Sequence, residues 1–189
     1  MAISEKPLLS EAEYLEMERE AETKSEFFRG EIFAMAGASR RRNLIVANLI
    51  VELGSRLRGG SCRVYPGDMR LKVTETGLIA YPDAMVACDP ERFADEREDV
   101  LLNPTVIVEV LSDSTERYDR GDKFRHYRTL DSLREYLLVS QKVRYVERFF
   151  RNAAGHWELR TVSEPEASIR IEAIGCEIPL AGVYAGIVP

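Results

Sequence analysis

The stretch that decides the fold covers residues 104–115 and reads PTVIVEVLSDST. Its residues from Thr105 to Leu111 are almost wholly apolar and β-branched, which is typical of a central strand buried on both faces. The charged residue within this run is Glu109. Burying a carboxylate in such a strand is costly unless the carboxylate is paired or binds a cation. Glu109 is therefore a candidate functional residue, and the alternative is a structural ion pair with a nearby arginine.

The segments on either side of this strand predict an α/β fold. Residues 116–129 follow it with the pattern of a helix, and residues 39–57 form the clearest helix, because apolar side chains recur there at helical spacing. Strands are expected at residues 62–65, 69–73, 78–87, 135–139, 143–150 and 156–162, with a hairpin at 24–36. We expect one domain over residues 1–189, with a mixed β-sheet flanked by helices and extra antiparallel hairpins.

Composition and charge narrow the class of protein. The 189 residues are 45% hydrophobic, which is enough for a core and too much for a disordered chain. A net charge of −6 argues against a protein that coats nucleic acid by bulk charge. The acidity is concentrated in residues 1–31 and 89–99, and the remaining chain carries a net positive charge. A local basic face for a nucleic acid is therefore compatible with the sequence.

The cysteines and the apolar runs predict the compartment. Cys62, Cys88 and Cys176 are far apart, without a C-x-x-C pattern, and neither histidine lies at metal-ligand spacing from them. We therefore expect neither a disulfide scaffold nor a structural zinc site, but thiols in a reducing cytosol. No apolar run approaches the length of a membrane span, and no signal peptide is expected. The sequence predicts a soluble, cytoplasmic protein without a membrane partner.

Two further side chains join Glu109 as candidates for chemistry. Asp83 follows Pro82 at the edge of an apolar strand, where it could also be a simple turn residue. Lys123 lies in the helix after the Glu109 strand, where it could also be a solvent-exposed lysine that pairs with Asp119. Together, two carboxylates on neighbouring strands can share Mg²⁺ or Mn²⁺, and a lysine can orient a metal-bound water. This set is the equipment of metal-dependent phosphodiester hydrolysis.

With these residues in place, the chain resembles the PD-(D/E)XK nuclease superfamily, and more closely the bacterial putative restriction endonucleases long labelled a domain of unknown function. The specific signals are the run EVLSDST at residues 109–115 and the pattern D-x-x-x-K-x-x-x-Y from Asp119 to Tyr127. Tyr81-Pro82-Asp83 is a weaker signal. The resemblance extends from about Tyr14 to Phe149 and implies a restriction-endonuclease-like core.

The resemblance also implies roles for individual residues. Asp83 and Glu109 would be metal ligands, and Lys123 would take the place of the superfamily lysine, because Leu111 stands where that lysine normally lies. Glu31 would be the acidic residue contributed by the N-terminal part. Asp68 and Tyr127 are candidates for the rim of the site.

One departure from the resemblance concerns the start of the long helix. Many relatives carry His followed by Asn there, whereas this chain has Arg42 before Asn43. Arg42 could instead hold a phosphate, together with Arg40, Arg41 and, on the later helix, Arg120. The alternative, that these basic residues only form solvent-exposed faces without a ligand, is about as frequent.

Three hypotheses for function follow. The first is a Mg²⁺-dependent or Mn²⁺-dependent DNA endonuclease, and the second is a non-catalytic nuclease-fold module that binds nucleic acid or protein. The third, a cysteine-dependent enzyme that uses Cys88, is weak because neither histidine is placed in sequence as its partner. A homodimer is a further expectation, since nucleases that cut both strands are often symmetric, with Tyr145, Phe149 and Phe150 as candidate interface residues.

Overall fold

A computed structural model describes residues 8–187, and their elements follow the predicted α/β order. The N-terminal part contains α1 (Glu11–Glu20), β1 (Ser25–Phe28), β2 (Glu31–Ala34) and α2 (Arg40–Leu57), followed by β3 (Cys62–Pro66), β4 (Arg70–Val73), β5 (Leu78–Ala80), β6 (Ala84–Cys88) and β7 (Val100–Leu101). The central strand is β8 (Val106–Leu111). It leads into α3 (Glu116–Tyr118), a π-helical turn (Asp119–Lys123) and α4 (Phe124–Tyr127).

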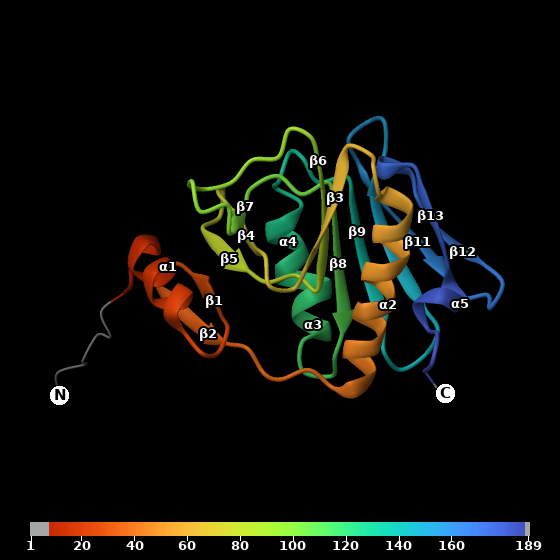
Figure 1. The fold of residues 1–189 in the computed structure, drawn as a ribbon, viewed down its shortest axis with the longest axis horizontal. Helices are drawn as coiled ribbons and strands as arrows, with labels where there is room; N and C mark the ends of the chain where they lie inside the picture. Colours follow the sequence, from red (N-terminus) through yellow and green to blue (C-terminus); the bar gives the residue numbers. More distant parts are fainter. Residues whose placement is uncertain (1–7, 188–189) are drawn as a thin grey trace.

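The C-terminal part adds three strands to the main sheet and a small hairpin. These elements are β9 (Glu135–Ser140), β10 (Val146–Arg151), β11 (Trp157–Val162), β12 (Ser168–Ile171), a 3₁₀ turn (Glu172–Ile174), β13 (Cys176–Pro179) and α5 (Leu180–Val183). The N-terminal unit of α1, β1 and β2 lies at the opposite side of the molecule from β12 and β13 (Figure 1). No helix within residues 8–187 has the length and apolar character that crossing a membrane requires.

The main sheet is mixed, as expected. Its six strands run in the order β11-β10-β9-β8-β6-β3, with β8 parallel to β9 and the other neighbours antiparallel. A second sheet has the order β2-β1-β5-β4-β7, and β12 pairs with β13. The prediction of a mixed α/β fold with added antiparallel hairpins is therefore confirmed.

The β8 strand separates two parts of the core, because successive side chains of a strand point to opposite faces. On one face, Val106, Val108 and Val110 pack with the apolar stripe of α2, which Figure 1 shows lying along the sheet. On the other face, Ile107 and Leu111 pack with Tyr127 and the strands of the second sheet. Glu109 lies between Ile107 and Leu111 on this second face, so its carboxylate points towards the segment from α3 to α4, where it contacts Lys123 and Tyr127.

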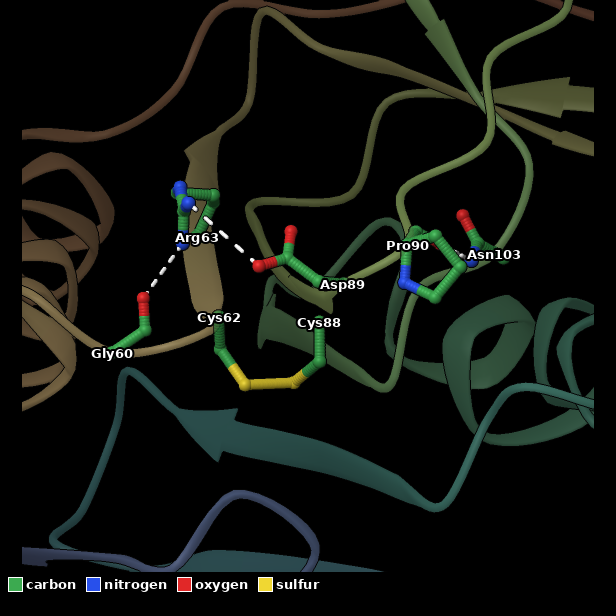
Figure 2. Close-up of a disulfide and its surroundings, with 7 residues drawn as sticks. All are labelled: Gly60, Cys62, Arg63, Cys88, Asp89, Pro90 and Asn103. Atoms are coloured by element: carbon green, nitrogen blue, oxygen red, sulfur yellow. Dashed lines mark hydrogen bonds and ion pairs between the residues drawn. A yellow bond between two sulfur atoms is a disulfide. The ribbon is translucent and has the colours of Figure 1, made fainter.

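The prediction that the cysteines are free thiols is wrong for two of them. Cys62 and Cys88 form a disulfide, whereas Cys176 is a buried free thiol. The two half-cystines are direct partners in the register of β3 and β6, and their Cα atoms lie 3.9 Å apart. Figure 2 shows the bond beside Arg63, which donates to the Gly60 carbonyl and faces Asp89. A sequence separation of 26 residues carries no local sign of this pairing.

Two aromatic side chains of the late hairpin pack against other residues of the same chain. Phe149 packs against Phe124 and Tyr136 inside the chain, and Phe150 is buried beside Arg148. These contacts bury Phe150 and half-bury Phe149 within the chain. The homodimer itself stays a prediction.

Candidate functional site

The two predicted metal carboxylates lie side by side at one end of the main sheet. Because β6 is antiparallel to β8 with Ala84 opposite Val108, continuing this register by one residue places Asp83 opposite Glu109. The backbone N–H of Val110 donates to Oδ2 of Asp83 at 2.8 Å, which fixes the aspartate against the central strand. Residues that lie opposite each other in an antiparallel pair share a face. Asp83 and Glu109 therefore point to the same side.

Lys123 joins this pair from the π-helical turn. Its Nζ lies 2.9 Å from Oε1 of Glu109, 2.9 Å from Oε1 of Glu26 and 3.8 Å from Oδ1 of Asp119. Tyr127, one turn further on, donates its hydroxyl to Oε1 of Glu109 at 3.0 Å. The predicted helix over 116–129 is thus interrupted by a π turn from Asp119 to Lys123, a local geometry that is frequent at functional sites.

Burial controls the protonation of this cluster. Burial raises the pKa of Glu109, Lys123 opposes this rise, and the nearby Asp119 and Asp83 add to it, so that the pKa is about 8 overall. Burial also raises the pKa of Asp119. For Lys123, burial by itself lowers the pKa, but Glu109, Glu26 and Asp119 outweigh it and raise the pKa overall. Lys123 is therefore a cation in the folded protein at neutral pH.

Arg42 neutralises the other carboxylate. Its Nε lies 3.1 Å from Oδ1 of Asp83 and its Nη2 lies 2.9 Å from Oδ2, so the guanidinium binds both oxygens. The side chains of Arg42 and Asp83 are 16% and 13% exposed. Although burial lowers the pKa of Arg42, Asp83 raises it overall, so the arginine stays charged.

Two cavities meet at Arg42. The first has a volume of about 410 Å³ and is lined by Glu26, Asp119 and Lys123, by the segment from Phe33 to Ser39, and by Ser112, Ser114, Thr115, Tyr118 and Gln141. The second has a volume of about 450 Å³ and includes Asp68, Tyr81 and Asp83 in its lining. Arg42 lines both, whereas Glu109 lines neither and is 1% exposed. The carboxylate of Glu109 therefore lies behind Lys123.

The structure brings together some predicted site residues and not others. Asp83, Glu109, Lys123, Tyr127 and Arg42 lie together: Asp83, Lys123 and Arg42 line the cavities, and the buried Glu109 and Tyr127 lie behind them. Glu31 does not reach the cluster: it is exposed at the start of β2, opposite Phe28, and lines neither cavity. This placement corrects the prediction for Glu31. The acidic residue that the N-terminal part contributes is Glu26 on β1, whose side chain contacts Lys123.

The residues predicted for the rim and for phosphate binding also lie partly at the cavities and partly away from them. Asp68 lines the second cavity and pairs with Lys24, with its own side chain 82% exposed. Arg40 is exposed and Arg41 is half-buried in the first turn of α2, and neither lines either cavity. Arg120 is held by Glu116 and Glu147 on the outside of the π turn and lines neither cavity. A role for Arg120 in binding phosphate gains no support.

Sequence reasoning missed three residues of the site. Glu26 pairs with Phe33 in the register of β1 and β2, so both side chains lie on the hairpin face that meets Lys123. Asp119 was noted only as a helix partner of Lys123, but it is buried in the cluster. Phe33 is 49% exposed at the cavity wall. The signal for Asp119 was the D-x-x-x-K spacing, whereas Glu26 and Phe33 carry no local sign.

The cluster gathers oxygen donors of the kind that a hard divalent cation prefers. Four carboxylates, Asp83, Glu109, Asp119 and Glu26, face two cations, Arg42 and Lys123, and this leaves an excess of negative charge. Carboxylate oxygens are the ligands that Mg²⁺ prefers. Within residues 8–187, however, no three His, Cys, Asp or Glu side chains surround one point as ligands would. A cation at Asp83 and Glu109 requires Arg42 or Lys123 to give up a carboxylate oxygen.

Comparison with known families identifies the chain. Residues 11–181 match the family model Uma2, described as putative restriction endonuclease. The chain belongs to the Uma2 family. Two uncharacterized proteins of Synechocystis sp. are similar to this Uma2 member: sll1609 is 36% identical over 169 residues, with 89% of this chain and 96% of the relative covered. The other, slr1290, is 35% identical over 184 residues, covering 96% and 94%.

A solved structure supports the Uma2 fold. The crystal structure of a putative nuclease belonging to DUF820 from Anabaena variabilis has a TM-score of 0.74 to this chain, at 15% sequence identity. It covers 92% of this chain and 96% of its own. At this identity the likeness shows the fold. The predicted resemblance to a restriction-endonuclease-like family and its fold are thus confirmed, while the cluster around Lys123 rests on the geometry described above.

Cysteine chemistry loses its candidate in the same structure. The Sγ of Cys88 is bonded to Cys62, so no thiolate is available there while the disulfide is intact. The remaining thiol, Cys176, is buried, and burial raises its pKa. Both observations argue against the cysteine-enzyme hypothesis.

Proposed function

We propose that this protein is a divalent-metal-dependent endonuclease that hydrolyses DNA phosphodiester bonds. The observation that carries the proposal is the buried Glu109 beside Asp83 and behind Lys123, which lines a cavity of about 410 Å³. A buried carboxylate with a raised pKa and a specific charged partner is a recognised sign of a functional site. The family membership and the nuclease fold support the same reading.

In this proposal Asp83 and Glu109 hold Mg²⁺ or Mn²⁺. The bound ion would supply positive charge against the scissile phosphate and lower the pKa of a water molecule. The protein prepares this place by fixing Asp83 with the Val110 N–H and Glu109 with the Tyr127 hydroxyl. Each carboxylate is then already held in a single orientation, which reduces the entropy cost of ordering it when the cation binds.

Lys123 acts as a charged hydrogen-bond donor rather than as a base. Its raised pKa keeps all three protons on Nζ at neutral pH, so it cannot remove a proton from water without first losing its carboxylate partners. Its place on the cavity wall suits the stabilisation of charge that develops on a phosphate oxygen. Glu26 and Asp119 hold Lys123 in this position.

The N-terminus of α2 would bind the DNA backbone. Ser39 caps this helix of 18 residues, and its first turn contains three arginines and no acid. The positive end of a helix dipole and arginine side chains both favour a phosphate. Ser39 and Arg42 line the first cavity, so a backbone held here would lie next to Lys123.

Cleavage of plasmid DNA tests the proposal. The protein is incubated with supercoiled plasmid and Mg²⁺ or Mn²⁺, beside Asp83→Asn and Lys123→Met, and single-stranded RNA serves as the competing substrate. Asp122→Asn is the matched control, because Asp122 lies on the same turn but is exposed and pairs with Arg125. We expect nicking by wild type and the control, and loss in both site variants. Equal cleavage by all four proteins would contradict the assignment.

A second candidate function is a non-catalytic module that binds nucleic acid. It is favoured by the fact that Arg42 already satisfies Asp83 and Lys123 already satisfies Glu109. DNA binding that weakens with salt, without turnover in either metal, would support this function instead.

Two coarser expectations stay predictions. A homodimer is checked by light scattering of the purified protein. The cytoplasmic location is checked by the thiol state of Cys62 and Cys88 in cells, since disulfides are rare in reducing compartments.

A further inference from the structure

Arg42 occupies Asp83 more completely than an ordinary ion pair requires. A carboxylate has about four lone-pair directions. The guanidinium takes one on each oxygen, and the Val110 N–H takes a second one on Oδ2. A divalent cation at Asp83 would therefore compete with Arg42 for the oxygens and would be repelled by its charge. In this arrangement Arg42 stands where the cation would otherwise neutralise Asp83.

The same arginine is placed to reach a phosphate. Arg42 lies in the first turn of α2, with its backbone N–H donating to Oγ of Ser39 at 3.1 Å. It lines the cavity that holds Lys123 as well as the cavity that holds Asp83. A guanidinium binds two oxygens of a phosphate as readily as two oxygens of a carboxylate. A phosphodiester in the first cavity thus offers Arg42 an alternative to Asp83.

We propose that Arg42 couples metal loading to substrate binding: the DNA phosphate draws Arg42 from Asp83, and the freed carboxylate then takes the divalent cation. This inference rests on the proposed function, because it uses the same metal carboxylates. Without DNA, Arg42 keeps Asp83 neutralised and the affinity for the cation low. With DNA, the affinity rises, and by thermodynamic reciprocity the cation raises the affinity for DNA by the same factor.

Lys123 does not provide an equivalent exchange. It is 6% exposed and is shared among three carboxylates, so a phosphate that attracts it still leaves Glu26 and Asp119 as its partners. The Arg42 guanidinium hydrogen-bonds to the single carboxylate of Asp83, so its move releases that group. The coupling is therefore expected to depend on residue 42.

Titration calorimetry with Ca²⁺ and a short DNA duplex tests the coupling. Ca²⁺ is a hard cation with the same preference for oxygen ligands. For wild type, we expect the Ca²⁺ affinity to rise about tenfold or more when the duplex is saturating, within the range usual for coupled sites. Arg42→Gln should bind Ca²⁺ more tightly than wild type without DNA and should show little further gain with DNA. Arg42→Lys, which keeps the charge but not the double contact, should lie between the two.

A neighbouring arginine gives the matched control. Arg40→Gln removes an exposed charge from the same helix turn without touching Asp83, so it should weaken DNA binding while the coupling factor stays as in wild type. Equal Ca²⁺ affinity of wild type and Arg42→Gln, or an unchanged coupling factor in Arg42→Gln, overturns the inference. Plasmid cleavage by wild type without coupling overturns the inference and leaves the nuclease proposal intact. Coupling without cleavage supports the role of Arg42 and contradicts the nuclease proposal.

Discussion

Replacing Lys123 by methionine should destabilise the protein strongly, because this lysine is the shared cation of three buried acids. Its Nζ lies 2.9 Å from both Glu26 and Glu109 and 3.8 Å from Asp119, and the four side chains are between 1% and 12% exposed. Removing one partner from a buried ion pair costs roughly 3–5 kcal/mol, since the remaining charge stays buried and unpaired. For a domain of this size the loss corresponds to a fall in Tm of roughly 6–20 °C.

The protonation of Glu109 makes this loss depend on pH. Because the pKa of Glu109 is raised to about 8, mainly by burial, Glu109 is protonated at pH 6 and ionised at pH 9, so removal of the lysine leaves one more unpaired buried charge at pH 9. The destabilisation in urea unfolding should therefore be smaller at pH 6 than at pH 9. The double variant Lys123→Met with Glu109→Gln should recover part of the loss. A loss below about 1 kcal/mol, or a double variant as unstable as the sum of the single changes, would refute the reasoning.

A second buried ion pair serves as the control for a functional role. Arg148 binds Glu135 at 2.5 Å, and the two side chains are 5% and 2% exposed, but neither lines either cavity at Arg42. Arg148→Met should cost a similar amount of stability. Added Mg²⁺ should restore stability to Lys123→Met and not to Arg148→Met, because only the former leaves carboxylates that the cation can reach. Equal responses to Mg²⁺ would contradict a metal site at the cluster.

Three further predictions concern pH, the disulfide and the cavity wall. Folding raises the pKa of Glu109 from 4.5 to about 8, so between these pH values the folded state binds one more proton than the unfolded state. The free energy of unfolding should therefore fall as the pH rises through this range, by at most about 1.4 kcal/mol per pH unit. Glu109→Gln should flatten this slope in urea unfolding measured at several pH values. The double change Cys62→Ser and Cys88→Ser should lower the free energy of unfolding by about 3.5 kcal/mol, because the disulfide closes a loop of 26 residues in the unfolded chain. Equal stability of the wild-type protein with and without reductant would contradict this prediction. Phe33→Ala should weaken single-stranded DNA binding, measured by fluorescence anisotropy, by up to about 1–3 kcal/mol, because an exposed aromatic at the cavity can stack on a base. Leu159→Ala, similarly exposed on β11, should leave that binding unchanged, and an equal loss in both variants would remove the stacking role of Phe33.

The proposals meet at one physical feature, the excess of acids over bases around Lys123. The protein keeps this excess buried by using Arg42 and Lys123 as internal cations and by raising the pKa of Glu109 and Asp119. Under the two proposals, a site held in this state would be stable without a metal and would accept one when an internal cation moves. The nuclease proposal concerns the acids, and the coupling proposal concerns Arg42.

Local sequence was sufficient for the central strand and for part of the site. The apolar run around Glu109 predicted a strand buried on both faces, and the structure places it in the middle of the main sheet. Helix spacing predicted that Lys123 pairs with Asp119, and the resemblance to the nuclease family gave Lys123 its place in the site. Hydrophobic periodicity and helix spacing are local properties, so they can be read without knowing the fold.

Tertiary structure alone decided which distant residues meet. Glu26 reaches Lys123 because of how the hairpin of β1 and β2 lies against the π turn, and the more promising Glu31 lies on the other strand, facing solvent. Arg42 and Asp83 are 41 residues apart, and their ion pair depends on where α2 begins relative to the end of β6. The disulfide between Cys62 and Cys88 depends on strand register in the same way. The sequence by itself determined the central strand and its buried acid, since burial follows from the pattern of neighbouring side chains. The partners of that acid were decided by packing between elements, because a long-range ion pair leaves no periodic signal along the chain.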